Sequence, residues 1–211
     1  MGEDGQVGGS AGDAGPNSDA VDSNHLDQAL DEVLVGGREE RLVVVAEPDP
    51  HWPVVFERHR AAIAGALGPR ARRIDHVGST SVPDLAAKPI VDIQVTVDDP
   101  EDDAGFSAAL EGLGYELRVR EPRHRMFRTE ARDVQVHVWT AGSDDERRHV
   151  LFRDWLRVDE ADRRLYEDTK RRLASRRWRD INYYAEAKAP VIVEIMARAE
   201  SWAARVHWRL D

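Results

Sequence analysis

Gly78, Ser79 and Thr80 form the segment of the chain best suited to holding a phosphate group. They stand where a short β-rich run, IDHV, ends and a loop of small residues begins. Glycine lets the backbone approach a phosphate closely, and the Ser79 hydroxyl and nearby amide groups can donate hydrogen bonds to it. Gly-Ser-Thr alone is a weak motif, so an ordinary turn is the alternative interpretation.

Asp92 lies between Val91 and Ile93 in an apolar run, PIVDIQV. An unpaired carboxylate in a buried strand costs on the order of several kcal/mol, so an acid there is usually paired, bound to a metal or catalytic. Strand side chains repeat every two residues, which places Gln94 on the same face. An acid at that position would complete a metal-binding pair, whereas Gln94 offers a neutral carbonyl oxygen. The alternative is an ion pair between Asp92 and an arginine.

His137 lies in another apolar run, VQVHVW, and shares one strand face with Gln135. If this strand pairs beside the strand of Asp92, the side chains of His137 and Asp92 converge. A histidine in that place could ligate a metal or act as a general base. The alternative is a histidine that hydrogen-bonds to a neighbour in the core or at the sheet edge.

The 30 basic residues include only three lysines, Lys88, Lys170 and Lys188. A general preference for arginine explains the excess. A lysine in such a background can mark a place where a compact ammonium is needed and a planar guanidinium would not fit; drift is the alternative. Lys88 lies close in sequence to Ser79 and Asp92, so it could bind phosphate as a point charge or neutralise Asp92.

Each of the other two lysines follows a tyrosine by four residues, as Tyr166 with Lys170 and Tyr184 with Lys188. On a helix this spacing places the two side chains one turn apart. Such a pair is catalytic in some oxidoreductases, but no glycine-rich dinucleotide motif follows a first strand here. The spacing therefore predicts neighbouring side chains, and the missing dinucleotide motif argues against an oxidoreductase.

Hydrophobic periodicity predicts the strands and helices that must position these side chains. Strands are expected at 42–45, 74–77, 89–95, 115–119, 126–129 and 134–139, the last two as a hairpin. Helices are expected at 52–67, 106–113, 147–158, 162–172 and 182–207. This order predicts an α+β fold with a small mixed sheet and a helical C-terminal part.

Residues 1–40 form an acidic tail that differs in composition from the rest. They contain ten acidic residues and one basic residue, which accounts for −9 of the net charge of −10. Residues 1–24 cannot bury enough apolar surface to offset ordering entropy, so we expect disorder there. One or two amphipathic turns are expected from Leu26 to Leu34, and a single domain is expected over 41–211.

Composition argues against several classes of protein. The domain is near neutral, which disfavours nucleic-acid binding through bulk charge. The chain has no cysteine, which excludes disulfides, thiol catalysis and cysteine-based zinc sites and fits a cytoplasmic location. No run reaches the ~20 apolar residues that a membrane span needs, and the first residues do not resemble a secretory signal.

Together these segments resemble the motifs of the GrpB family, which belongs to the nucleotidyltransferase-fold superfamily of polymerase β type. The resemblance spans roughly residues 43–211, and its most specific part is the combination of Gly-Ser-Thr with AKPIVD. One departure is Asp84, at a position where relatives usually have glycine. The matching segments are DPHWP (49–53), HVGSTSVP (76–83), LAAKPIVD (85–92), FRDWLR (152–157) and Tyr184 with Lys188.

The resemblance implies a mixed sheet of nucleotidyltransferase type, flanked by helices, with two groups of site residues. Those around the phosphates of an NTP are Gly78, Ser79, Thr80 and Lys88. Those around a Mg²⁺ or Mn²⁺ ion are Asp92, Gln94 and His137. Active members of the superfamily hold metal with two or three acids, whereas Gln94 and His137 stand where the second and third acids are expected.

Two functions follow from the resemblance. The first is transfer of a nucleotidyl group from an NTP to an unknown acceptor, with Asp92 and His137 as catalytic residues. The second is a non-catalytic module that binds a nucleotide or a protein partner, which the missing acids favour. The family is also similar to a domain attached to dephospho-CoA kinase in some bacteria, which suggests an accessory role. One more acid beside Asp92 and His137 would favour the enzyme, and an arginine sealing Asp92 inside the sheet would argue against it.

Overall fold

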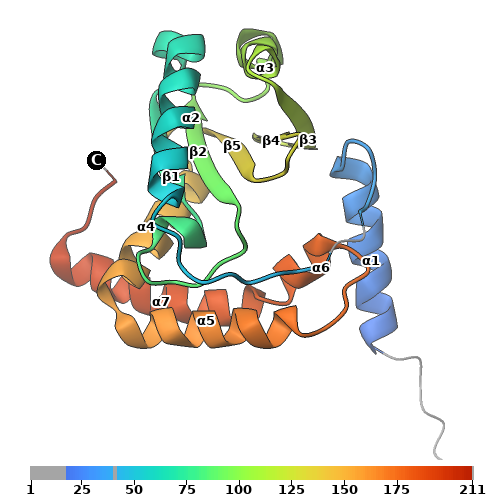
Figure 1. Cartoon of the computed structure of the whole chain (residues 1–211), viewed down its shortest axis with the longest axis vertical. Helices are drawn as coiled ribbons and strands as arrows, with labels where there is room; N and C mark the ends of the chain where they lie inside the picture. Colours follow the sequence, from blue (N-terminus) through green and yellow to red (C-terminus); the bar gives the residue numbers. More distant parts are fainter. Residues whose placement is uncertain (1–17, 40–41, 211) are drawn as a thin grey trace, which may run out of the picture.

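The computed structural model of this 211-residue chain describes residues 18–39 and 42–210 (Figure 1). The strands are β1 (Arg73–Val77), β2 (Val91–Val97), β3 (Tyr115–Glu121), β4 (His124–Thr129) and β5 (Val134–Thr140). The helices are α1 (Ser18–Val33), α2 (Trp52–Leu67), α3 (Asp103–Gly112), α4 (Asp144–Val158), α5 (Glu160–Ala174), α6 (Ile181–Glu186) and α7 (Ala189–Val206). Two short 3-10 helices are η1 (Gly68–Arg70) and η2 (Ser79–Ser81).

The five strands form one mixed sheet. Their order is β1-β2-β5-β4-β3, with β2 and β5 parallel and the other neighbours antiparallel. The parallel pairing sets Asp92 opposite Gln135 and Gln94 opposite His137, and these side chains share one face because strand residues alternate between faces. The predicted α+β fold with a small mixed sheet is confirmed.

The two faces of the sheet differ because apolar and polar residues alternate along β2 and β5. The apolar face packs on α2 and α3. This core includes Val91, Ile93 and Val95 of β2, Val134, Val136 and Val138 of β5, Phe56 and Ile63 of α2, and Phe106 and Leu110 of α3. The polar face is turned toward α4 and toward the helical layer of α5, α6 and α7, which lies below the sheet in Figure 1.

A second apolar core joins α4, α5 and α7 to the loop between η2 and β2. Its buried members are Val82, Leu85, Leu151, Trp155, Leu156, Tyr166, Val191, Ile195, Met196, Ala199 and Ala203. This core anchors the helical layer to the loop that follows β1. In the described part of the chain, no helix is both long and apolar enough to span a membrane.

Two predicted elements are wrong. Residues 42–45 are not a strand, because Leu42 and Val44 are exposed and, among the described residues, the segment is followed by just a single bridge between Ala46 and Ala87. The helix predicted at 182–207 is divided into α6 and α7, since Pro190 lies in the first turn of α7 and cannot continue a helix from α6. The other predicted elements are present, with ends that differ by a few residues.

Part of the acidic tail contacts the domain. Residues 18–24, predicted to be disordered, belong to α1, which is longer than the one or two turns predicted. After α1, Leu34 bridges Val119, and Arg118 donates to the carbonyl oxygens of Val35 and Gly37. This segment therefore covers the edge strand β3, whose backbone groups would otherwise be open to pairing.

Two predictions about the tail fall wholly or partly outside the described residues. The disorder expected over residues 1–17 is one, and the domain boundary expected at residues 40–41 is the other. Within the described range, Asp27 of α1 accepts hydrogen bonds from Arg179 and from Tyr183 of α6. These contacts attach α1 to the end of the helical layer, where Figure 1 shows α1 beside α6.

Candidate functional site

A cavity of about 490 Å³ lies between the polar face of the sheet and the helical layer. Six of the seven predicted site residues line it, namely Gly78, Ser79, Thr80, Lys88, Asp92 and His137. Helix α4 adds Asp145, Arg148, His149 and Arg153, and the helical layer adds Tyr166, Lys170, Tyr184 and Lys188. The fold thus brings the loop, two strands and four helical segments to one place.

Gly78 connects β1 to η2 in a backbone conformation that favours glycine. Its φ is 68°, and a Cβ atom there would lie 2.3 Å from Oδ2 and 3.0 Å from Cβ of Asp92. The loop backbone therefore lies directly against the Asp92 side chain. Asp84 also has a positive φ, of 60°, which agrees with the glycine expected at this position in relatives.

Thr80 lines the cavity, but its hydroxyl is used to hold the loop. It donates to the carbonyl oxygen of Ile90 at 3.1 Å and lies 3.0 Å from Nε2 of His76. Burial lowers the pKa of His76 to about 4, so this imidazole is neutral at physiological pH. The Thr80 hydroxyl is thus a structural link between the loop, β1 and the residue before β2.

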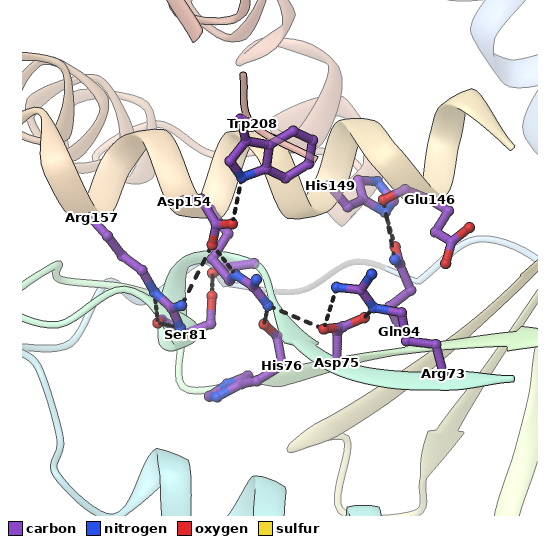
Figure 2. A network of polar contacts seen from close by, with 12 residues as sticks. Arg73, Asp75, His76, Ser81, Gln94, Glu146, His149, Asp154, Arg157 and Trp208 are labelled. Carbon is purple, nitrogen blue, oxygen red and sulfur yellow. Dashed lines mark hydrogen bonds and ion pairs between the residues drawn. The ribbon is translucent and has the colours of Figure 1, made fainter. Parts of the chain in front are cut away.

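Two arginines of α4 hold the backbone of the same loop. Arg153 donates to the carbonyl oxygen of His76 at 3.1 Å, and Arg157 donates to the carbonyl oxygen of Ser81 at 2.8 Å. Figure 2 shows Arg157 reaching Ser81 from α4. The FRDWLR segment therefore fixes the backbone on both sides of Ser79.

Gln94, predicted as a metal ligand, faces α4 and does not line the cavity. Its side chain is fully buried, its Nε2 donates to the carbonyl oxygen of Glu146 at 3.2 Å, and its Oε1 lies 3.0 Å from Nδ1 of His149 (Figure 2). Because Oε1 can only accept, His149 donates from Nδ1. Burial lowers the pKa of His149 to about 4, so its Nε2 carries a lone pair. Gln94 therefore orients His149, which does line the cavity.

His137 stands between Asp92 and a second histidine. Its Nε2 lies 3.8 Å from Oδ1 of Asp92, and its Nδ1 lies 3.2 Å from Nε2 of His124. The other ring nitrogen of His124, Nδ1, lies 2.8 Å from Oε2 of Glu121. The His124 ring also stacks on Trp139, with centroids 3.8 Å apart. Four titratable side chains from β2, β5, β4 and β3 thus form one row that starts at the cavity.

All three lysines of the chain line this cavity. The two predicted Tyr-x-x-x-Lys contacts are confirmed, with Lys170 Nζ 4.8 Å from the Tyr166 ring centroid and Lys188 Nζ 5.0 Å from that of Tyr184. Lys88 Nζ lies 5.5 Å from the same Tyr184 ring. Cations over aromatic faces are attracted by the ring quadrupole, so the tyrosines hold the ammonium groups at the cavity wall.

Lys170 is buried and Lys188 is partly buried, and neither has a carboxylate partner among the described residues. In the described chain, neither Lys170 nor Lys188 forms an ion pair, and Lys170 donates to the carbonyl oxygen of Ala86. Burial, reinforced by the positive charge of Lys188, lowers the pKa of Lys170 to about 7. Burial also lowers the pKa of Lys188. The helical wall therefore carries positive charge that the protein itself leaves largely unbalanced.

The residues at the Asp92 corner do not form a resident three-ligand metal site. Asp92 and His137 are close, but Gln94 points to α4, and within the described ranges no three His, Asp or Glu side chains gather suitably for a metal ion. Among the described residues, no arginine forms an ion pair with Asp92, whose Oδ1 lies 3.8 Å from Nε2 of His137. The Asp92 carboxylate is therefore open to an ion that arrives with a ligand.

Several residues that line the cavity could not be identified as site residues from the sequence. His149 and Arg148 lie on a helix far from Asp92 in sequence, and no local pattern connects them to the loop. Lys170 and Lys188 were distinguished only as rare lysines after tyrosines. Their shared rarity in an arginine-rich chain was the signal that could have placed them beside Lys88.

Comparison with known proteins identifies relatives of this chain. The family model described as GrpB protein matches residues 42–198. A UPF0157 protein of Halalkalibacterium halodurans is 41% identical over 192 residues, covering 88% of this chain and 98% of that protein. The dephospho-CoA kinase of Mycobacterium leprae is 31% identical over 194 residues, covering 77% of this chain but 47% of that protein.

One solved structure gives a consistent result. The conserved protein GrpB from Enterococcus faecalis aligns with a TM-score of 0.67 and 32% identity, over 75% of this chain and 99% of that chain. The Cid1 poly(U) polymerase is a much weaker match, with a TM-score of 0.43 and 12% identity over 75% of this chain and 48% of that chain. Matched by the family model over 157 consecutive residues, from 42 to 198, the chain belongs to the GrpB family.

Proposed function

We propose that the cavity binds the phosphate groups of a nucleotide. The observation that carries the proposal is that all three lysines of an arginine-rich chain line one cavity together with Gly78 and Ser79. A compact ammonium with three donors suits phosphate oxygens at close range. Charges taken out of water without an opposite charge are costly, and phosphate oxygens would give Lys170 and Lys188 the anionic partners that the described chain lacks.

The rest of the cavity suits the remainder of a nucleotide. Phe152, Tyr166, Tyr184 and Ile192 supply apolar and aromatic surface to its wall, and nucleobases stack on aromatic side chains. Its volume of about 490 Å³ lies within the range of roughly 300–1,000 Å³ that is typical of small-ligand sites. These features support a ligand with both an anionic and an aromatic part.

Nucleotidyl transfer to an unknown acceptor is a second candidate, favoured by the presence of His137 beside Asp92 in the same cavity. In that reaction an acceptor hydroxyl oxygen would bond to the α-phosphorus of an NTP, pyrophosphate would leave, and the hydroxyl proton would pass to His137. Asp92 would supply a protein carboxylate for a Mg²⁺ or Mn²⁺ ion that arrives with the NTP. An accessory role with a protein partner also stays a prediction.

Titration of NTPs against the wild type and Asp92→Ala, in EDTA and with Mg²⁺ or Mn²⁺, separates the two candidates. Saturable binding by both proteins in EDTA is the result that lysine-based binding predicts. Binding that needs metal and disappears in Asp92→Ala would favour nucleotidyl transfer. No binding under any of these conditions would contradict both.

A further inference from the structure

The row of side chains from Glu121 to Asp92 runs from the protein surface to the cavity. His124 is buried, with 7% of its surface exposed, and both of its ring nitrogens have partners. On one side lies Glu121, at the β3–β4 hairpin and partly open to solvent; on the other lies His137 at the cavity. The row therefore connects the protein surface with the nitrogen that faces Asp92.

The partners of His124 determine where its hydrogen lies. An ionised carboxylate only accepts hydrogen bonds, so His124 donates to Glu121 from Nδ1, across 2.8 Å. A neutral imidazole has one N–H group, so Nε2 of His124 is an acceptor. The donor that it faces at 3.2 Å is Nδ1 of His137.

This contact decides between two groups that compete for the hydrogen of His137. Hydrogen bonds from nitrogen to an acceptor span about 2.7–3.2 Å. The contact with His124 is within that range, whereas Oδ1 of Asp92 lies 3.8 Å from Nε2 and is outside it. Without His124, the nearby carboxylate would draw the hydrogen to Nε2.

We infer that Glu121 and His124 are positioning residues that keep the hydrogen of His137 on Nδ1, so that His137 presents the lone pair of Nε2 to the cavity. A lone pair there can accept a proton from a hydroxyl group or a water molecule of a bound ligand. This inference goes beyond nucleotide binding, because it assigns a proton acceptor whatever the ligand. The stacked Trp139 ring keeps the His124 ring in its orientation.

Long-range ¹H–¹⁵N spectra of the ¹⁵N-histidine-labelled full chain test the inference, because they distinguish the two tautomers. The His137 signals are assigned by their loss in His137→Gln. We expect the Nδ1–H tautomer in the wild type and a shift toward Nε2–H in His124→Phe, which retains an aromatic ring against Trp139. An Nε2–H tautomer in the wild type would overturn the inference.

A second variant keeps the test decisive if His124→Phe does not fold. Glu121→Leu alters a partly exposed residue and removes the acceptor for Nδ1 of His124, so we expect hydrogen to move toward Nε2 of His137, beside Asp92. Glu116→Leu, an exposed change on the same strand, is the matched control and should leave the His137 spectrum unchanged. Identical His137 spectra for the wild type and Glu121→Leu would contradict the assigned roles.

Discussion

The floor of the cavity and its helical wall differ in how their polar side chains are paired. On the floor, which the sheet provides, polar side chains are matched to one another, as in the row from Asp92 through His137 to His124. On the helical wall, buried Lys170 and partly buried Lys188 lie beside tyrosine rings and form no ion pair with the described residues. The floor is complete without a ligand, whereas the wall holds charge that a ligand can balance.

This difference indicates which part of the cavity determines the affinity for a ligand. Charges that are already paired gain little from a new partner, while unpaired buried cations gain a great deal. Retaining such cations also lowers the stability of the unliganded protein, which is a common cost of binding sites. We therefore expect changes in the wall to alter ligand affinity and changes in the floor to alter geometry.

The largest effect is expected for the double substitution Lys88→Met with Lys188→Met. Each hydrogen bond to a charged group contributes about 1.5–3 kcal/mol, so affinity for a nucleoside triphosphate in EDTA should fall at least ~100-fold. Isothermal titration calorimetry measures this. Arg172→Met removes an exposed cation from α5 and serves as the control, with affinity close to that of the wild type. Equal affinities for the double variant and the control would show that the wall does not bind the ligand.

Lys170→Met tests the charge burial itself through pH. The pKa of Lys170 is about 7 in the fold and 10.5 as the ordinary value, so the unfolded state binds more protons between these limits. The stability of the wild type relative to Lys170→Met should therefore rise with pH between about 7 and 10.5. This difference in stability should be lowest below pH 7.

The size of that difference follows from proton affinity. Because a tenfold change in proton affinity corresponds to about 1.4 kcal/mol, the free energy of unfolding of the wild type minus that of the variant should increase by roughly 4 kcal/mol between pH 6 and 10. Urea denaturation at several pH values measures it, with Arg172→Met as the matched control. Parallel curves for wild type and Lys170→Met would mean that Lys170 is not a buried charge.

On the floor, Gly78→Ala should displace Asp92. Both Gly78 and Gly114 have positive φ, of 68° and 86°, but a Cβ atom meets Asp92 at the first position and nothing within 4 Å at the second. We expect Gly114→Ala to cost about 1 kcal/mol for backbone strain and Gly78→Ala about 2 kcal/mol more. Chemical denaturation of the pair measures the difference. Equal losses would show that the loop does not press on Asp92.

The smallest effect is expected for Asp92→Asn. In EDTA the Asp92 carboxylate repels bound phosphates, so its neutralisation should strengthen triphosphate binding about threefold, in line with weakly screened charges at a partly exposed site. The exposed acid Asp99, changed to Asn, is the control for overall charge. Weaker binding by Asp92→Asn in EDTA would place Asp92 among the groups that attract the ligand.

Much of the fold could be predicted because local patterns determined it. The period of the apolar residues located α2 and the β4–β5 hairpin, and the parallel pairing of β2 with β5 confirmed that Asp92 and His137 converge. Two errors came from giving apolar runs too much weight. Exposed Leu42 and Val44 do not form a strand, and Pro190 divides a continuous apolar pattern.

The site was less predictable because its details depend on contacts between distant segments. Gln94 was identified as unusual, but its role as a support for His149 requires α4 to lie over the sheet. The row through His124 requires four strands to come into register. By contrast, the rarity of lysine was visible in composition, and only the fold could show that Lys88, Lys170 and Lys188 meet in one cavity.

The most direct test of phosphate binding by the cavity lysines is a crystal structure of the full chain with ATP bound in EDTA. The account predicts triphosphate oxygens about 3 Å from the ammonium groups of Lys88 and Lys188, close to the Gly78–Ser79 backbone. A triphosphate bound elsewhere, or one held in the cavity with the lysines turned away from it, would contradict the account.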